Sequence, residues 1–581
     1  MSSRDTDRSR RKSAIALAAL LMLGAATVPV SAQTSTLPDH TATRDIAPDS
    51  AAAERLGAPL DRPLAAAIEK RVVSGKVDKE IEGEFGPGVS RAVRHAYASR
   101  LFAPVWTEAG ARAFREETRH LFEHGIVADD VFEADLDDLI DARFSERSAK
   151  RRAKADTRLT LAALRAAQAV SGELTDEGGR DLDAGAPKRS RLTDFIVASG
   201  TGNFGDELSA LAPRHPQYGK LQDAMAHYRK LKREGGWAAI PDGDLIEEGD
   251  TDPRVSALRL RLAAEGFDST ADASDPDLMN ASTLAALKAF QRRHGLEDDG
   301  VVGGNTLEAL NESVESKVAR IAESMHRWRA HGDLGERYVL ANIPSYTAEG
   351  WNDGVREISM RTVVGKPQHA TPVFSDTVEY VVANPKWYVP RSIARRQKLS
   401  KLRADPSYAP RKGYQVVSLD TGQAVSSASV DWNDPDVLSR YRLVQQPGDN
   451  NALGELKIIF PNQYSVYLHG TPTMHLFDEA QRAFSSGCVR LEDPEAMARW
   501  IAEGDPELTP SDISEQLDSG ERERMNLNER IPVHITYITV TVNDAGEPVF
   551  HRDVYDRLDE IETVKRVAAL SGGPRERSAA P

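Results

Sequence analysis

Two side chains of the sequence have the types and positions needed for nucleophilic catalysis. Cys488 is the only cysteine of the chain and lies in a short glycine-containing loop, Ser485-Ser486-Gly487-Cys488. His469 lies upstream of it, just beyond the end of a predicted β-strand. A neighbouring imidazole can generate the thiolate, which is the reactive form of cysteine. The sequence therefore predicts a cysteine nucleophile assisted by a histidine base.

The loop around the thiol also suits acyl transfer. Gly487 is small enough to let a substrate carbonyl approach, and Ser486 belongs to the same turn. Backbone N–H groups near Gly487 and Cys488 could stabilise an oxyanion. We expect these residues to form the oxyanion-binding part of the site.

Other interpretations of these residues are weaker. A zinc site of His469, His475 and Cys488 has no recognisable fourth ligand, so we expect no metal and no cofactor. A papain-like peptidase would place its histidine after the cysteine, whereas here the histidine comes first. An inert buried thiol is the remaining alternative on residue statistics alone.

Composition limits the classes of protein that are compatible with the sequence. The 581 residues exceed what one hydrophobic core can organise, so several domains are expected. The 74 basic and 89 acidic residues give a net charge of −15, which argues against a nucleic-acid-binding protein. A single cysteine excludes an intrachain disulfide and a CxxC site.

The N-terminus has the features of a secretory signal over residues 1–32. Five basic residues precede an apolar run from Ala14 to Ala26, and Val30-Ser31-Ala32 suits cleavage. We therefore expect an exported protein, anchored in a membrane only if this segment is not cleaved. Residues 33–62 are expected to form a flexible lead-in.

The rest of the chain separates by pattern into a multidomain α+β protein. Residues 63–249 have helical periodicity and are expected to form a helical scaffold domain, completed by residues 312–335. Residues 250–311 predict a small three-helix bundle. Residues 336–555 are mainly β, as a sandwich or barrel-like sheet, interrupted by a polar, basic insertion at 391–446 that is helical at first and loop-like afterwards. Residues 556–581 are expected to form a C-terminal helix and tail.

The bundle resembles the peptidoglycan-binding domain type 1 family. The resemblance is carried by the run from Ala286 to Leu296, the turn Asp299-Gly300-Val301-Val302-Gly303, and Thr306-Leu307. It implies a module that binds wall glycan. The alternative is a helical spacer between domains, because no single residue of such a bundle proves carbohydrate contact.

The mainly β region resembles the L,D-transpeptidase catalytic domain, also called the YkuD domain. The resemblance is carried by His469 with Ser485 to Leu491, and by three further motifs: Asn384 to Pro390, Pro447 to Gly454, and Phe460-Pro461-Asn462. It is closest to the large periplasmic members that have a scaffold domain and a wall-binding domain. Many members have a histidine two positions before the nucleophile, where this chain has Ser486.

The resemblance implies a periplasmic enzyme that acts on peptidoglycan stem peptides. Cys488 would attack the third residue of a tetrapeptide stem, release the terminal D-alanine and form a thioester, with His469 as general base. An amine of a neighbouring stem would then complete a 3→3 cross-link. Water as acceptor would make the protein an L,D-carboxypeptidase, and a protein acceptor would make it a ligase. A non-catalytic wall-binding scaffold is the alternative of another class.

Three more residues are expected to bind substrate. Arg490 could pair with a substrate carboxylate, with a structural salt bridge as the alternative. Tyr467 precedes the histidine in the same strand, and Trp387 could line the cleft, although packing is the simpler role for Trp351, Trp387 and Trp432. The insertion at 391–446 is expected to act as a mobile lid over the thiol.

Overall fold

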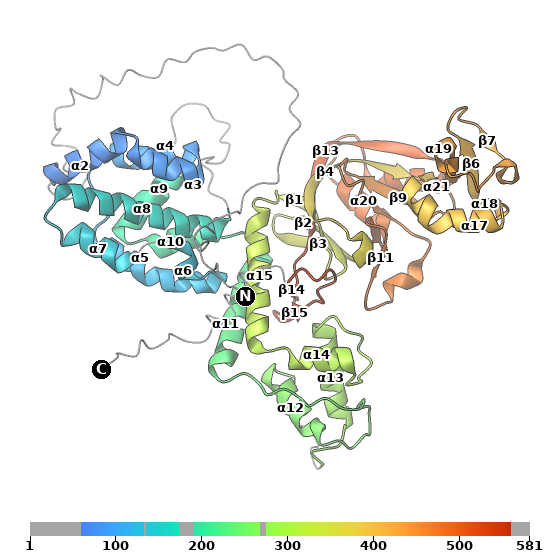
Figure 1. Cartoon of the computed structure of the whole chain (residues 1–581), viewed down its shortest axis with the longest axis horizontal. Coiled ribbons are helices and arrows are strands. Elements are labelled where there is room, and N and C mark those ends of the chain that lie inside the picture. Colours follow the sequence, from blue (N-terminus) through green and yellow to red (C-terminus); the bar gives the residue numbers. More distant parts are fainter. Residues whose placement is uncertain (1–59, 133–134, 173–190, 268–274, 559–581) are drawn as a thin grey trace, which may run out of the picture. The chain divides into compact units, whose positions relative to one another are not determined.

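The computed structural model describes residues 60–132, 135–172, 191–267 and 275–558 (Figure 1). The expected signal peptide at 1–32 lies outside these residues, as do almost all of the lead-in and the C-terminal segment after Leu558. No helix within the described part of the chain is long and apolar enough to cross a membrane.

The first region is helical, as its periodicity predicts. Its helices pack around one apolar core that includes Tyr97, Trp106, Phe114 and Leu164. The helices are α2 (Arg62–Val73), α3 (Lys76–Phe85), α4 (Pro87–Ala98), α5 (Glu108–Glu117), η1 (Thr118–His124), α6 (Ala128–Val131), α7 (Leu136–Phe144), α8 (Ala149–Ser171), α9 (Arg191–Thr201) and α10 (Phe204–Ser209).

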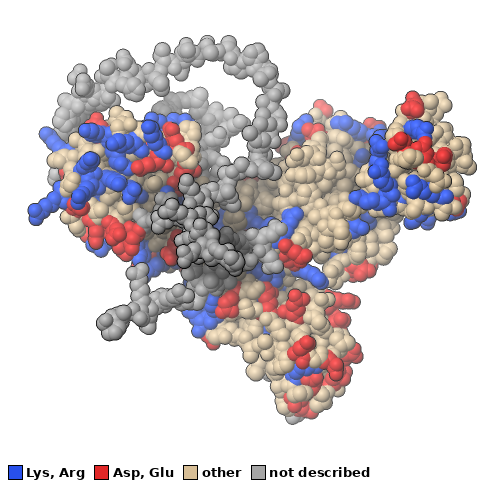
Figure 2. Space-filling view, viewed as in Figure 1, with Lys and Arg blue, Asp and Glu red and all other residues tan. Residues whose placement is uncertain are grey.

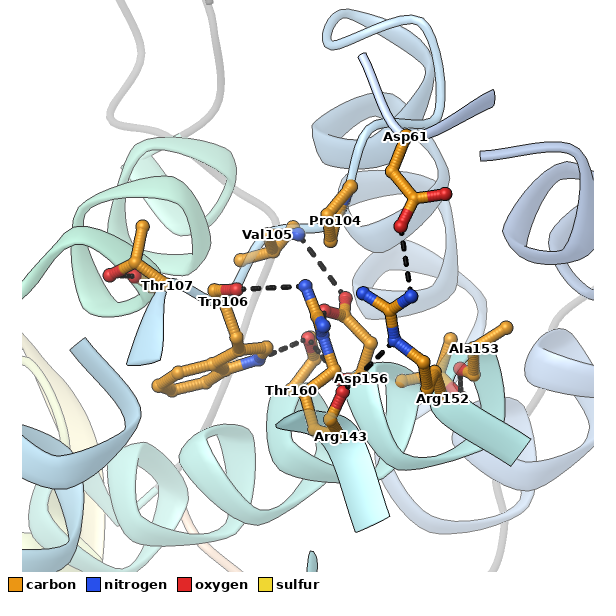
Figure 3. A network of polar contacts seen from close by, with 12 residues as sticks. Asp61, Pro104, Val105, Trp106, Thr107, Arg143, Arg152, Ala153, Asp156 and Thr160 are labelled. Carbon is orange, nitrogen blue, oxygen red and sulfur yellow. Dashed lines mark hydrogen bonds and ion pairs between the residues drawn. The ribbon is translucent and has the colours of Figure 1, made fainter. Parts of the chain in front are cut away.

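A buried ion pair holds the apolar turn that precedes α5. Asp156 accepts hydrogen bonds from Arg143 Nε at 2.7 Å and from the Val105 N–H at 3.2 Å, while Arg143 also donates to the Trp106 carbonyl (Figure 3). The Trp106 indole donates to Thr160 on α8. Because a buried charge must be paired and hydrogen-bonded, this network fixes the turn to α8. Its role is structural.

Two long helices form a separate packing unit. Helix α11 (Pro216–Arg233) packs on α15 (Val314–His331), and both contact the strand pair β14 (Val540–Val542) and β15 (Pro548–Phe550). Helix α15 therefore packs on the helical region through α11 and through Arg329, which donates to the His124 carbonyl, and α11 and α15 also pack on the β region.

The three predicted helices of the small bundle are present. They are α12 (Arg254–Ala264), α13 (Ala281–Arg293) and α14 (Gly304–Asn311). Leu258, Leu262, Leu287, Phe290 and Leu310 form the centre of their shared core. The apolar spacing of the sequence thus predicts which faces are buried.

The β region forms a sheet that closes on itself. Among the described residues it has nine strands in the order β11-β3-β12-β10-β9-β4-β13-β1-β2, and an additional pairing joins β2, at one end, to β3, which is next to the other end. Of the two expected forms, the barrel is therefore correct. The strands are β1 (Arg337–Asn342), β2 (Thr347–Asn352), β3 (Val355–Gly365), β4 (Phe374–Ala383), β9 (Leu456–Ile459), β10 (Leu468–His469), β11 (Ala483–Ser485), β12 (Val489–Leu491) and β13 (Glu523–Thr536).

Two helices contribute to the core of the barrel. Helix α20 (Pro494–Ala502) begins after Asp493, whose side chain accepts the Ala496 N–H, and it is followed by α21 (Pro510–Asp518). Met497 and Ile513 are fully buried against the strands. Since α20 follows β12 almost directly, it anchors the strand that leaves the cysteine loop.

The insertion is an organised subdomain, which corrects the expectation that its second half is loop-like. Together with β5 (Trp387–Tyr388), which precedes it, the insertion forms a four-stranded sheet in the order β5-β8-β6-β7 within the described residues, and a core that includes Leu402 and Trp432. The elements of the insertion itself are α16 (Arg391–Ile393), the π-helical turn η3 (Ala394–Lys398), α17 (Leu399–Ala404), α18 (Tyr408–Arg411), β6 (Tyr414–Ser418), β7 (Ala424–Val425), η4 (Ser427–Ser429), α19 (Val437–Arg440) and β8 (Tyr441–Gln445). In Figure 2, Lys and Arg side chains gather over the part of the insertion that carries α17.

Candidate active site

The register of two short strands brings the predicted catalytic residues together. Strands β10 and β12 are parallel, with Leu468 opposite Val489 and His469 opposite Arg490. Leu468 and Val489 are fully buried in the barrel core. Because side chains alternate along a strand, His469 and Arg490 lie on the other face, and Cys488 precedes Val489 on that same face. The register therefore places the thiol and the imidazole on the same face of neighbouring strands.

The loop that carries the thiol is held by two hydroxyl groups. The buried Ser485 Oγ accepts the Gly487 N–H at 3.0 Å and donates to the Cys488 carbonyl at 2.5 Å. Thr371 donates to the Gly487 carbonyl at 2.9 Å. Gly487 has φ +121°, a conformation that favours glycine. The nucleophile is therefore presented by a turn whose backbone is fixed on both sides.

This geometry modifies the expected oxyanion site. The Gly487 N–H is already bonded to Ser485, so it is not available to a substrate oxygen. The Cys488 N–H has no acceptor among the described residues and is therefore available to a substrate oxygen. Ser486 is exposed at the tip of the turn. Thr371 was not predicted, because nothing in its local sequence connects it to a loop so far along the chain.

The thiol is partly exposed and is protonated in the free protein. Its Sγ lies 3.8 Å from the Ser465 carbonyl. Burial raises the pKa of Cys488, while hydrogen bonds from Tyr467 and the nearby charges of Arg490 and Lys457 act in the opposite direction. Because burial is the largest influence, the thiol needs a base to become a nucleophile.

His469 is neutral and buried. Its Nδ1 lies 2.5 Å from the Gly470 carbonyl, so Nδ1 carries the proton and donates it there. Burial and the charge of Arg490 lower the pKa of His469 to about 3, against the opposing effect of the Gly470 and Leu453 carbonyls. The imidazole is thus in its basic form at neutral pH. Among the described residues it makes no hydrogen bond to the thiol, so direct proton transfer requires a side-chain movement.

Two cations flank the imidazole on the neighbouring strands. Arg490 is opposite His469 in β12, and Lys457 is opposite it in the antiparallel strand β9. Arg490 makes no ion pair within the described part of the chain, and its buried Nε has no hydrogen-bond partner. The salt-bridge alternative for Arg490 is therefore not supported. Lys457 was not predicted as a site residue, because its nearness to His469 depends on strand pairing.

Of the two aromatic residues expected to bind substrate, Tyr467 lies at the candidate site and Trp387 lies in the hydrophobic core of the insertion. Tyr467 is hydrogen-bonded to Cys488, its ring lies 5.4 Å from that of His469, and it packs against the core of the insertion. Trp387 is buried in that same core, 6.2 Å from the Tyr414 ring. Its packing role is therefore the one that the structure supports, and Trp351 and Trp432 are buried as well.

The zinc interpretation finds no further ligands. Over the described residues, no group of three or more His, Cys, Asp or Glu side chains is arranged to hold a metal ion. His475 lies in the short helix η5 (Met474–Phe477), outside the strand row that holds His469. We assign no role to it.

Family profiles match three parts of the chain. Residues 336–508 match the L,D-transpeptidase catalytic domain (YkuD), residues 91–225 match a scaffold domain, and residues 251–310 match the profile described as "Putative peptidoglycan binding domain". These matches correspond to the barrel region, the helical region and the three-helix bundle. The predicted resemblance and fold class are confirmed.

Individual relatives agree with these matches. A Haemophilus influenzae protein named "Putative L,D-transpeptidase" is 32% identical over 244 residues, which are 42% of this chain and 49% of the relative. The chain therefore matches about half the length of this curated relative.

Two solved structures are similar at low identity. An L,D-transpeptidase from Mycobacterium smegmatis is 16% identical with a TM-score of 0.16, covering 35% of this chain and 58% of that one. An L,D-transpeptidase from Stackebrandtia nassauensis is 17% identical with a TM-score of 0.19, covering 51% and 96% respectively. The sequence matches agree on one family, since residues 336–508 match the L,D-transpeptidase catalytic domain profile and the curated relative is itself named a putative L,D-transpeptidase.

Proposed function

We propose that this protein is a periplasmic peptidoglycan L,D-transpeptidase that forms 3→3 cross-links through a thioester on Cys488. The observation that carries the proposal is the β10–β12 register, which sets His469 and Arg490 beside the thiol on one face of the barrel. A partly exposed thiol, a neutral imidazole and an unpaired guanidinium are the groups that such a reaction needs.

In the first step, Cys488 Sγ bonds to the carbonyl carbon of the third stem residue. The thiol proton passes to His469, and the oxyanion is held by the Cys488 N–H. The C–N bond to the terminal D-amino acid then breaks, and His469 returns the proton to the leaving amine. Tyr467, which contacts the thiol, positions Sγ for the attack.

In the second step, the amine of another stem attacks the thioester carbon. His469 takes a proton from that amine, and the C–S bond breaks as the new amide forms. The proton then returns to Sγ, which restores the thiol. Water in place of the amine would give a tripeptide, and a protein amine would give a protein linked to the wall.

Purified sacculi test the proposal and separate its alternatives. After incubation with the protein, mass spectrometry of the released muropeptides should show new 3→3 dimers. Shortened tripeptides alone would indicate a carboxypeptidase, and protein-linked stems would indicate a ligase. Cys488→Ala and His469→Ala should abolish the product, whereas His475→Ala, a nearby histidine outside the site, should not. If the folded protein does not change the muropeptides at all, the remaining interpretation is a non-catalytic wall-binding scaffold.

We propose that the bundle at 250–311 binds wall glycan and holds the catalytic domain on it. Its deletion should lower pull-down of the protein on sacculi while β-lactam acylation of Cys488 persists. Lys317 of α15 is ion-paired with Glu265 of the bundle, so the deletion should include Lys317→Met to avoid a buried unpaired charge. Unchanged pull-down would identify the bundle as a spacer.

A further inference from the structure

Three basic side chains form a row across adjacent strands beside the thiol. In strand order they are Lys457 of β9, His469 of β10 and Arg490 of β12, with His469 as the register partner of both others. Neighbouring strands are about 5 Å apart, so the two outer cations lie one strand spacing on either side of the imidazole. Lys457 and Arg490 therefore bracket the base at close range.

Within the described ranges of the chain, neither cation forms an ion pair with a carboxylate. The buried Nε of Arg490 has no hydrogen-bond partner among the described residues. Burial lowers the pKa of Arg490, and the ionisable group that opposes this effect is the Cys488 thiol, not a carboxylate. The groups that act on the pKa of Lys457 are Arg522 and Cys488. Lys457 Nζ lies 5.7 Å from the centre of the Tyr467 ring. Two partly buried cations left unpaired by the protein are suited to an anionic ligand.

The reaction itself places a carboxylate at this row. His469 has to protonate the nitrogen of the residue that leaves, and the carboxylate of a terminal D-amino acid is only two bonds from that nitrogen. A carboxylate held so close to the imidazole is within reach of a cation on either adjacent strand. In a longer stem, the same position would be an uncharged amide.

We propose that Lys457 and Arg490 together bind the free C-terminal carboxylate of the donor stem, and that they select stems ending at the residue to be released. This inference rests on the proposed function and extends it, because it names the residues that recognise the C-terminal carboxylate of the donor stem. Lys457 is then a specificity-determining residue that the sequence did not reveal.

The test compares two synthetic donor tetrapeptides that differ only at the C-terminus, one a free carboxylate and the other an amide. The wild-type protein should form the Cys488 thioester faster with the carboxylate, measured as kcat/KM for release of the terminal residue. Lys457→Met, which keeps the stem of the side chain, should reduce this preference about tenfold to a hundredfold. Arg490→Gln should reduce it as well. Any effect of Lys457 on the thiol pKa should alter both peptides equally and cancel in the ratio.

Arg522→Gln is the matched control, since this exposed arginine acts on Lys457 electrostatically without belonging to the row. It should leave the preference nearly unchanged. A preference that persists in Lys457→Met, or an equal loss in Arg522→Gln, would overturn the inference while the transpeptidase function stands. Absence of turnover of both peptides by the wild-type protein would instead contradict the proposed function.

Discussion

His469 lies directly opposite Arg490 in the parallel pair of β10 and β12, and this relationship sets the ionisation of the site. Burial is the main reason that the pKa of His469 is lowered, and the guanidinium adds to it, so the imidazole is neutral. The same guanidinium moderates the raised pKa of Cys488. One cation therefore acts on both partners of the proton transfer.

The first prediction is an unusual pH profile for acylation of Cys488. The pKa of the thiol is raised above its ordinary 9.0, so the rate should keep rising with pH beyond pH 9. The pKa of His469 is about 3, so no inflection should appear near 6.5. The measurement is β-lactam acylation followed by intact mass spectrometry between pH 5 and 10.

A variant of Lys457 tests the electrostatic origin of this pH profile. Lys457 lowers the pKa of Cys488, so Lys457→Met should displace the whole profile to higher pH. A wild-type rate that levels off below pH 8 would show that the thiol is ionised more easily than its burial implies.

Ser485 supports the second prediction. Its hydroxyl satisfies two backbone groups of the cysteine loop, so Ser485→Ala would leave the buried Gly487 N–H and the Cys488 carbonyl without this partner. The loss should cost about 1–3 kcal/mol and slow acylation by about tenfold, because the turn no longer fixes the thiol. Ser429→Ala, an exposed serine of the insertion, should change neither the melting temperature nor the acylation rate. Acylation at the wild-type rate in Ser485→Ala would show that the loop does not depend on this hydroxyl.

The sequence predicts the candidate catalytic residues but not the residues that surround them. The type and order of His469 and Cys488 predict a nucleophile and a base, and the helical spacing around Phe290 predicts the bundle. Lys457 could not be assigned, because it reaches the site only through the pairing of β9 with β10. The strands of the insertion, such as β6 with Tyr414–Ser418, are too short and too polar in context to separate from loops. Closure of the barrel through β2 and β3 likewise depends on pairing between strands.

Acid sensitivity is the third prediction, and it follows from buried neutral histidines. Burial lowers the pKa of several of these side chains to about 3 or 4: His124, His215, His331, His469 and His551. In the unfolded chain they bind a proton at about pH 6.5, whereas the folded protein does not until the pH falls to about 4 or below. The free energy of unfolding should therefore decrease as the pH falls below 6.5. Urea unfolding at pH 7.5 and pH 5 measures this, and equal midpoints would contradict it.

Glu265 carries the fourth prediction. This buried carboxylate of the bundle is paired with Arg261 at 2.7 Å and with Lys317 of α15 at 2.6 Å, and it accepts the Tyr228 hydroxyl. Glu265→Gln would leave two buried cations without a counter-ion, which should cost about 3–5 kcal/mol. The melting temperature should fall, while Glu308→Gln, on an exposed face of the same bundle, should have no effect. An unchanged melting temperature in Glu265→Gln would show that the cluster does not hold the bundle to α15.

The last prediction concerns the insertion as a lid. Its core contains Leu453, whose carbonyl contacts His469, and Tyr467 packs on the same core. Replacing residues 391–446 with a short linker would therefore disturb the base as well as the lid. A milder change is Leu402→Ala. Leu402 is fully buried in the insertion and is not one of the residues, Leu453 and Tyr467, that connect this core to the catalytic site. The cavity left by this substitution should lower the free energy of unfolding of the insertion by about 2–5 kcal/mol.

A loosened insertion should admit water to the thioester. The ratio of 3→3 dimers to tripeptides should then fall in Leu402→Ala, with Cys488 acylated at close to the wild-type rate. Leu419→Ala removes the same atoms from an exposed position of the insertion and should keep the wild-type ratio. Hydrogen exchange across residues 391–446 verifies that the first variant is looser. If exchange increases while the ratio of products stays constant, the insertion does not control which acceptor resolves the thioester.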